Sequence, residues 1–169
     1  MIASSLGHSY RRGLPRLLVA LAAVLAVLWA IQIYPRAEAL FMPVNLLTAQ
    51  LSAVILAGIG LPMLRESTLL MHSGGFSCEI DFACTALIPV LLLSAGIFAW
   101  RAQRSQQWLA VLVGSLFLVG VNQLRIVSLV WLGVHAPGWL DIAHLWFWPL
   151  ALIVITVGYW YGWTRIVRH

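Results

Sequence analysis

One arginine interrupts a long apolar stretch of the sequence. Arg125 carries the only formal charge in the run Trp108–Val134 and lies 17 residues beyond Trp108, about 26 Å along a helix. A charge inside a membrane-spanning helix is costly and marks a functional site by default, although an arginine near the end of a span can instead extend to the interface. Asn122 lies three residues earlier and so shares its helical face. We expect Asn122 and Arg125 to form a polar spot directed at a partner helix.

A cysteine opens the apolar run before this one. Cys84 lies at the start of Phe82–Trp100, where the amides of a helix N-terminus and a nearby cation would lower the pKa of a thiol. The position therefore suits a reactive thiolate. Two alternatives stay open: a buried apolar cysteine, or a disulfide with Cys78 in an oxidising exterior.

A histidine opens the last apolar run. His144 lies near the start of Ile142–Trp163, three residues after Asp141. The aspartate can cap that helix and orient the imidazole, as an acceptor does for a catalytic histidine. The alternative is an interfacial histidine without a chemical role. Histidine and cysteine nowhere have the close spacing of metal ligands, so we expect neither a metal nor another cofactor.

The composition identifies the environment of these residues. Of the 169 residues, 62% are hydrophobic and only 9% are charged, whereas about a quarter are charged in soluble domains. The net charge of +5 comes from ten arginines that are distributed between apolar runs. Such a distribution reports membrane topology and not nucleic-acid binding. The sequence therefore predicts a single all-α integral membrane domain over residues 1–169.

Four apolar runs are long enough to cross a bilayer, which takes about 20 residues. They are residues 17–34, 82–100, 108–134 and 142–163. The first lacks a convincing cleavage site, so we expect it to be an uncleaved helix that follows a tail over residues 1–16. Polar residues, glycines and a proline interrupt a further run over residues 41–64, which either forms a fifth span or lies in the interface as a re-entrant segment.

The arginines favour four spans over five. With five spans they divide four against five, whereas with four spans seven share one side with both termini. The positive-inside rule then makes that side cytoplasmic. The outer side contains residues 35–81 and 135–141, and the glycine-containing turn at residues 73–75 predicts a small β-hairpin between strands at 68–72 and 76–80.

This topology brings three chemical groups to one depth. Cys84, Arg125 and His144 then lie on three different helices near the outer surface. A thiol nucleophile, a fixed cation and a base are the components of thiol-dependent acyl transfer.

The residues also resemble a known family, the exosortase/archaeosortase family of membrane-embedded cysteine transpeptidases. The resemblance extends from about Arg36 to Trp163 and rests on three ordered segments: Gly75–Ile80 followed by Cys84-Thr85, Asn122–Ser128, and Asp141–His144. One departure is Ala86, where many members of that family have glycine.

The resemblance implies an activity and a set of partners. Cys84 would be the nucleophile, Arg125 the oxyanion-stabilising cation and His144 the base or acid, with Asn122 and Asp141 in support. Substrates would be exported proteins that end in a sorting signal, composed of a short motif, a transmembrane helix and a basic tail. A lipid or glycan would accept the cleaved protein at the outer face of the inner (cytoplasmic) membrane.

Two other functions stay open on the sequence. A membrane thiol oxidoreductase would use Cys78 and Cys84, but five residues separate them and Arg125 would have no task. A non-enzymatic scaffold or transporter subunit would need a polar pathway, yet Arg125 is the only charge within the expected spans.

Overall fold

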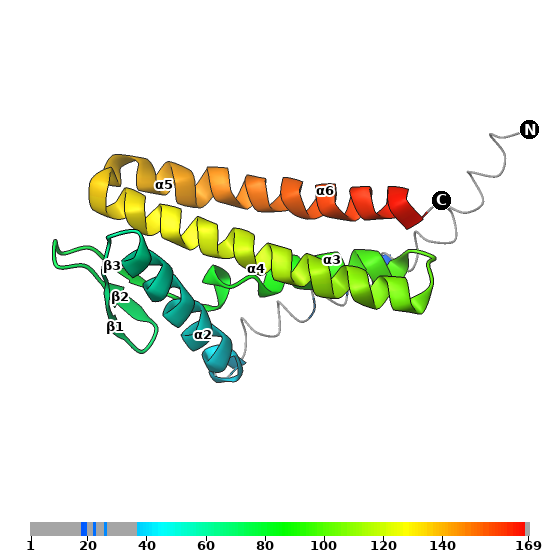
Figure 1. Cartoon of the computed structure of the whole chain (residues 1–169), viewed down its shortest axis with the longest axis horizontal. Helices are drawn as coiled ribbons and strands as arrows, with labels where there is room; N and C mark the ends of the chain where they lie inside the picture. The colour runs from blue at the N-terminus through cyan, green and yellow to red at the C-terminus, as the bar shows by residue number, and fades with distance from the viewer. Residues whose placement is uncertain (1–17, 20–21, 23–25, 27–36, 168–169) are drawn as a thin grey trace, which may run out of the picture.

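The computed structural model describes residues 37–167, together with residues 18, 19, 22 and 26. The predicted tail over residues 1–16 lies outside the described residues, as does most of the predicted span 17–34. The described part is mostly helical, with a small sheet at one end (Figure 1).

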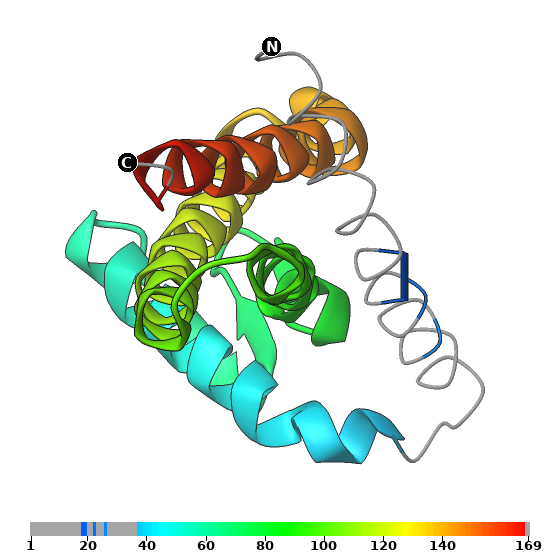
Figure 2. The same cartoon turned by 90° about the vertical axis from the view of Figure 1, so that its right-hand side faces the viewer.

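Two long helices form the axis of the described structure. In chain order the elements are α2 (Ala37–Gly58), β1 (Leu64–Glu66), β2 (Leu69–Met71), β3 (Ser77–Glu79), η1 (Phe82–Cys84), α3 (Leu87–Ala99), α4 (Arg104–His135), η2 (Pro137–Trp139), α5 (Leu140–Ile142), η3 (Ala143–Phe147) and α6 (Trp148–Val167). Helices α4 and α6 lie side by side in opposite directions, and α2 is inclined to α4 (Figures 1 and 2).

Small residues let α3, α4 and α6 approach closely. A Cβ atom at Gly114 of α4 would lie 2.5 Å from a Leu93 methyl on α3 and 2.8 Å from the Tyr159 ring on α6. The Tyr159 hydroxyl donates a hydrogen bond of 3.0 Å to the carbonyl of Ala110. Small residues at helix contacts are the usual packing solution where lipid surrounds a bundle.

Three described helical segments are long and apolar enough to cross a membrane: Ala39–Gly58, Arg104–His135 and Pro137–Val167. The last two contain the predicted spans 108–134 and 142–163. The first covers much of the run 41–64, which was expected to be interfacial or a fifth span, and it is one continuous helix apart from Pro43 in its interior.

The expected span over residues 82–100 is not one continuous helix. A single 3-10 turn, η1, is followed by extended backbone at Thr85, with φ −91° and ψ 163°. Only the 13 residues of α3 are α-helical. The Asp81 side chain caps η1, and the chain leaves the helical conformation at Thr85 before α3 begins at Leu87.

The sheet contains the predicted hairpin and one further strand. Strands β2 and β3 pair antiparallel with Leu70 opposite Cys78, and Gly75 in their connection has φ +92°, which glycine adopts without strain. Strand β1 adds to the free edge of β2. Its connection to β2 contains Ser67 at φ 57° and none of the glycine or asparagine signals that mark such turns.

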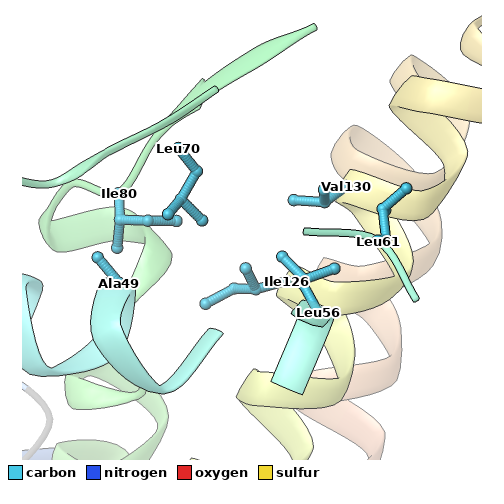
Figure 3. Close-up of a cluster of buried hydrophobic side chains, with 7 residues drawn as sticks. All are labelled: Ala49, Leu56, Leu61, Leu70, Ile80, Ile126 and Val130. Carbon is cyan, nitrogen blue, oxygen red and sulfur yellow. The ribbon is translucent and has the colours of Figure 1, made fainter. Parts of the chain in front are cut away.

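A core of buried hydrophobic side chains joins the sheet to α2 and α4. Its buried side chains come from all three parts of this region, as Figure 3 shows: Ala49, Leu56, Leu61, Leu70, Ile80, Ile126 and Val130. The two thiols, of Cys78 and Cys84, pack at its border. This core therefore fixes the segment that contains both cysteines against α2 and α4.

Candidate active site

Cys84 ends a tight turn between the sheet and α3. The Asp81 Oδ1 atom accepts a hydrogen bond of 3.0 Å from the Cys84 amide. The Thr85 hydroxyl donates one of 2.7 Å to the carbonyl of Phe82. Both bonds fix the backbone on either side of the thiol, which is half-buried.

The predicted polar spot on α4 faces this turn. Asn122 is 1% exposed and Arg125 is 8% exposed. Asn122 Nδ2 donates a hydrogen bond of 2.8 Å to the carbonyl of Cys84, and Arg125 Nη1 donates one of 3.3 Å to the carbonyl of Ala83. Arg125 Nη1 also lies 3.4 Å from Asn122 Oδ1. The structure thus brings Cys84, Asn122 and Arg125 together, and the partner of the polar spot is a turn and not a helix.

The charge of Arg125 is buried without a carboxylate. Within residues 37–167 no acidic side chain forms a salt bridge with it, and its Nε atom is buried without a hydrogen-bond partner. An unpaired buried cation is strongly unfavourable, and a buried donor without an acceptor adds to that cost. The guanidinium therefore has both charge and hydrogen-bonding capacity available for a ligand.

Burial dominates the acidity of the thiol. It raises the pKa of Cys84 from its ordinary value of 9.0 to about 11, and the opposing effect of Arg125 is smaller. The expectation of a lowered thiol pKa is therefore wrong. A single 3-10 turn provides little of the helix dipole that would stabilise a thiolate, and the side chain is partly removed from water.

Cys78 lies next to Cys84 without being bonded to it. Both cysteines are free thiols, and their sulfur atoms lie 3.8 Å and 3.9 Å from the same carbonyl oxygen, that of Glu79. Burial also raises the pKa of Cys78, with Asp81 as the next cause. The disulfide that the sequence left open is not formed.

His144 reaches the same level of the bundle but does not contact the thiol. Arg125 lies 15 residues after Ala110, and His144 lies 15 residues before Tyr159. Ala110 on α4 and Tyr159 on the antiparallel α6 are joined by a hydrogen bond. Equal numbers of residues from this bond toward the same end of the two helices lead to Arg125 and His144, which therefore lie at about the same level. The imidazole is exposed, and within the described residues it forms no hydrogen bond, with Asp141 or with any other group.

Two features of the site were not predicted from the sequence. The first is Asp81, whose position three residues before Cys84 is the spacing of a capping residue and its amide. The second is the π-helical turn η3, Ala143–Phe147, which contains His144. Such turns have no clear sequence signal and occur often at functional sites.

Metal ions in proteins are held by groups of histidine, cysteine and carboxylate side chains. Within the described part of the chain, histidine, cysteine, aspartate and glutamate nowhere form a group of three that could hold one. The described site contains a thiol and a buried cation that both lie at the η1 turn, and the exposed imidazole of His144 lies at about the same level without a hydrogen bond to either.

Comparison with known proteins gives one match. Residues 3–158 match the family model described as Transmembrane exosortase (Exosortase_EpsH). No curated protein and no solved structure matches the chain. The matched range covers nearly the whole sequence and includes Cys84, Arg125 and His144. Three described helical segments are long and apolar enough to cross a membrane. The chain therefore belongs to the transmembrane exosortase family of multi-pass membrane proteins.

Proposed function

We propose that the protein is a sorting transpeptidase that cleaves exported proteins through a thioester on Cys84. Its substrates would carry a C-terminal signal made of a short motif, a transmembrane helix and a basic tail. Membership of the exosortase family supports the substrate class. Transfer to a lipid or glycan acceptor would complete the reaction and regenerate the thiol.

The buried and unneutralised guanidinium of Arg125 carries the proposal. Its Nε–H has no acceptor among the described residues, and its Nη1 bonds to the residue before Cys84. Attack of the sulfur on a peptide carbonyl creates a negative oxygen next to this group. A fixed donor and cation at that position stabilises the transition state more than the ground state.

The proton of Cys84 needs a base in this mechanism. With a pKa of about 11, the thiol is protonated at neutral pH, so proton removal must accompany attack. We assign that step to His144, which would take the thiol proton and deliver it to the leaving amine. Because the imidazole is exposed and without a hydrogen bond to the described residues, we propose that it engages the thiol when substrate is bound.

Asn122 and Asp141 complete the proposed site in supporting roles. Asn122 joins the guanidinium of Arg125 to the carbonyl of Cys84 through its two amide atoms, so it keeps nucleophile and cation at a fixed separation. Asp141 would orient His144 in the substrate complex.

We also propose the topology that the arginines favour. The single domain would cross the inner membrane four times, with both termini in the cytoplasm and the site near the extracytoplasmic face. The sheet and the connection between α4 and α6 lie at the same end of the structure, opposite the α3–α4 connection (Figure 1), which supports this arrangement. Cysteine accessibility along α2 tests whether that helix crosses.

Coexpression with substrates tests the activity. A reporter is fused in turn to each candidate C-terminal signal of the host, and processing is followed as a loss of mass. Cys84→Ala and Cys84→Ser should both abolish processing, whereas Cys78→Ala should leave most of it. Loss with Cys78→Ala but not with Cys84→Ala contradicts the proposal and favours chemistry centred on Cys78.

Arg125→Lys tests the role of the guanidinium. Lysine keeps the charge but cannot present the planar fork of donors. We expect processing to fall at least 100-fold, a loss within the range for an oxyanion-stabilising donor. Near-normal turnover would contradict a role in catalysis and leave Arg125 only its contact with the Ala83 carbonyl.

A further inference from the structure

A second buried polar atom without a partner lies on α2, the helix that packs against η1. Asn45 of α2 is 7% exposed, and its Oδ1 atom accepts no hydrogen bond from the described residues. Nearly all buried polar atoms of folded proteins are paired, and an unpaired one lowers stability. Burial of the Asn45 side-chain oxygen without a partner therefore lowers the stability of the folded chain.

The neighbours of Asn45 on α2 show which way it faces. Phe41, one turn earlier, contacts the Phe82 ring of η1 at a centroid distance of 4.6 Å. Ala49, one turn later, is fully buried with Ile80 and Ile126 (Figure 3). Residues four apart share a helical face, so Asn45 faces the region between η1 and α4.

The other polar side chains on this side of α2 are satisfied. The Thr48 hydroxyl donates to the carbonyl of Val44 at 2.8 Å. The Ser52 hydroxyl lies 2.8 Å from Gln123 Oε1 on α4. The missing partner is therefore particular to Asn45 and not a general feature of this helix contact.

Two helices thus flank the Cys84 turn with complementary unpaired atoms. Arg125 Nε on α4 is a buried donor, and Asn45 Oδ1 on α2 is a buried acceptor. An extended peptide presents carbonyl oxygens and N–H groups along its main chain. A carbonyl oxygen is the partner that Arg125 Nε lacks, and an N–H group is the partner that Asn45 Oδ1 lacks.

We infer that Asn45 is a substrate-binding residue that accepts a hydrogen bond from a main-chain N–H of the peptide segment bound at Cys84. Arg125 Nε donates a hydrogen bond to a carbonyl oxygen of the same segment, so Asn45 and Arg125 bind the peptide backbone from two sides. Recognition of the main chain makes this subsite indifferent to substrate side chains. The inference rests on the proposed function, because it needs a peptide as the ligand.

Asn45→Leu tests the inference, since leucine has nearly the same size and no polar atom. The full chain in proteoliposomes is assayed with the reporter that the wild type processes. We expect kcat/KM to fall about tenfold, chiefly through KM, while Tm stays equal or rises because an unpaired acceptor is removed. Thr48→Val is the matched control: another buried polar-to-apolar change on α2, for which we expect wild-type KM.

Binding provides a second measurement that does not depend on turnover. In a Cys84→Ala background, the affinity for the uncleaved reporter should fall about tenfold with either Asn45→Leu or Asn45→Ala. Unchanged KM and affinity overturn the inference, and so does a loss of activity that is accompanied by a lower Tm in both variants. Full processing by Cys84→Ala alone instead refutes the proposed function, so the two failures are distinguishable.

Discussion

The acidity of Cys84 leads to a prediction about its reactivity. Burial outweighs Arg125 and raises the pKa of the thiol to about 11. Only the thiolate attacks an alkylating reagent. The substrate-free protein should therefore react slowly at neutral pH, in contrast to cysteine enzymes that keep a preformed thiolate.

The size of the effect follows from the shift. A thiol with a pKa of about 11 is ionised to about one part in 10⁴ at pH 7, which is about 100-fold less than at its ordinary pKa of 9.0. The same shift makes the folded chain less stable at high pH. It has no effect below pH 9, and stability falls as the pH rises from 9 towards 11, because the unfolded chain releases its thiol proton first.

The assay is alkylation by a small neutral reagent, with Cys78→Ala used to isolate the signal of Cys84. The rate should rise about tenfold per pH unit from pH 7 to beyond pH 9, without a plateau. Arg125→Leu should lower it further, because the guanidinium opposes the shift. A plateau at or below pH 7 would refute the reasoning, since it would mean that Arg125 prevails over burial.

Three further substitutions test how the site is held. Asn122→Ala removes the partner of the Cys84 carbonyl and should lower stability by about 2 kcal/mol, measured as Tm, together with processing. Gly133→Ala would drive a Cβ atom into the Phe76 ring, so processing should fall and recover when Phe76→Ala is added; no recovery would contradict the packing argument. Gly114→Ala would meet Leu93 at 2.5 Å and should lower Tm by several degrees through overpacking of about 1–3 kcal/mol.

Local patterns were enough to predict the polar spot and the hairpin. Asn122 and Arg125 face one partner because three residues are nearly one helical turn, and this spacing holds in any environment. The turn before Phe76 could be located because glycine tolerates positive φ at Gly75. Both predictions depend on neighbours within the same element.

Features that depend on distant contacts were not predicted. The thiol pKa of Cys84 is set by burial against α2 and α4, which no local pattern reports. Strand β1 pairs along the free edge of β2, although Ser67 is an unusual residue for the turn between them. The unpaired state of Asn45 likewise depends on which groups of α4 and η1 come near it.

The polar residues of α4 have a structural task in addition to the proposed chemical one. Residues 82–85 are not α-helical, so the carbonyls of this segment need donors other than those of a regular helix. Asn122 and Arg125 provide them, at Cys84 and Ala83. Loss of function after removal of Arg125 would therefore not distinguish a disordered turn from a lost oxyanion donor. Arg125→Lys separates the two, because its single charged nitrogen can satisfy the Ala83 carbonyl but cannot also replace Nε. A variant that keeps its Tm and loses turnover would then show that guanidinium donors other than Nη1 act on the substrate.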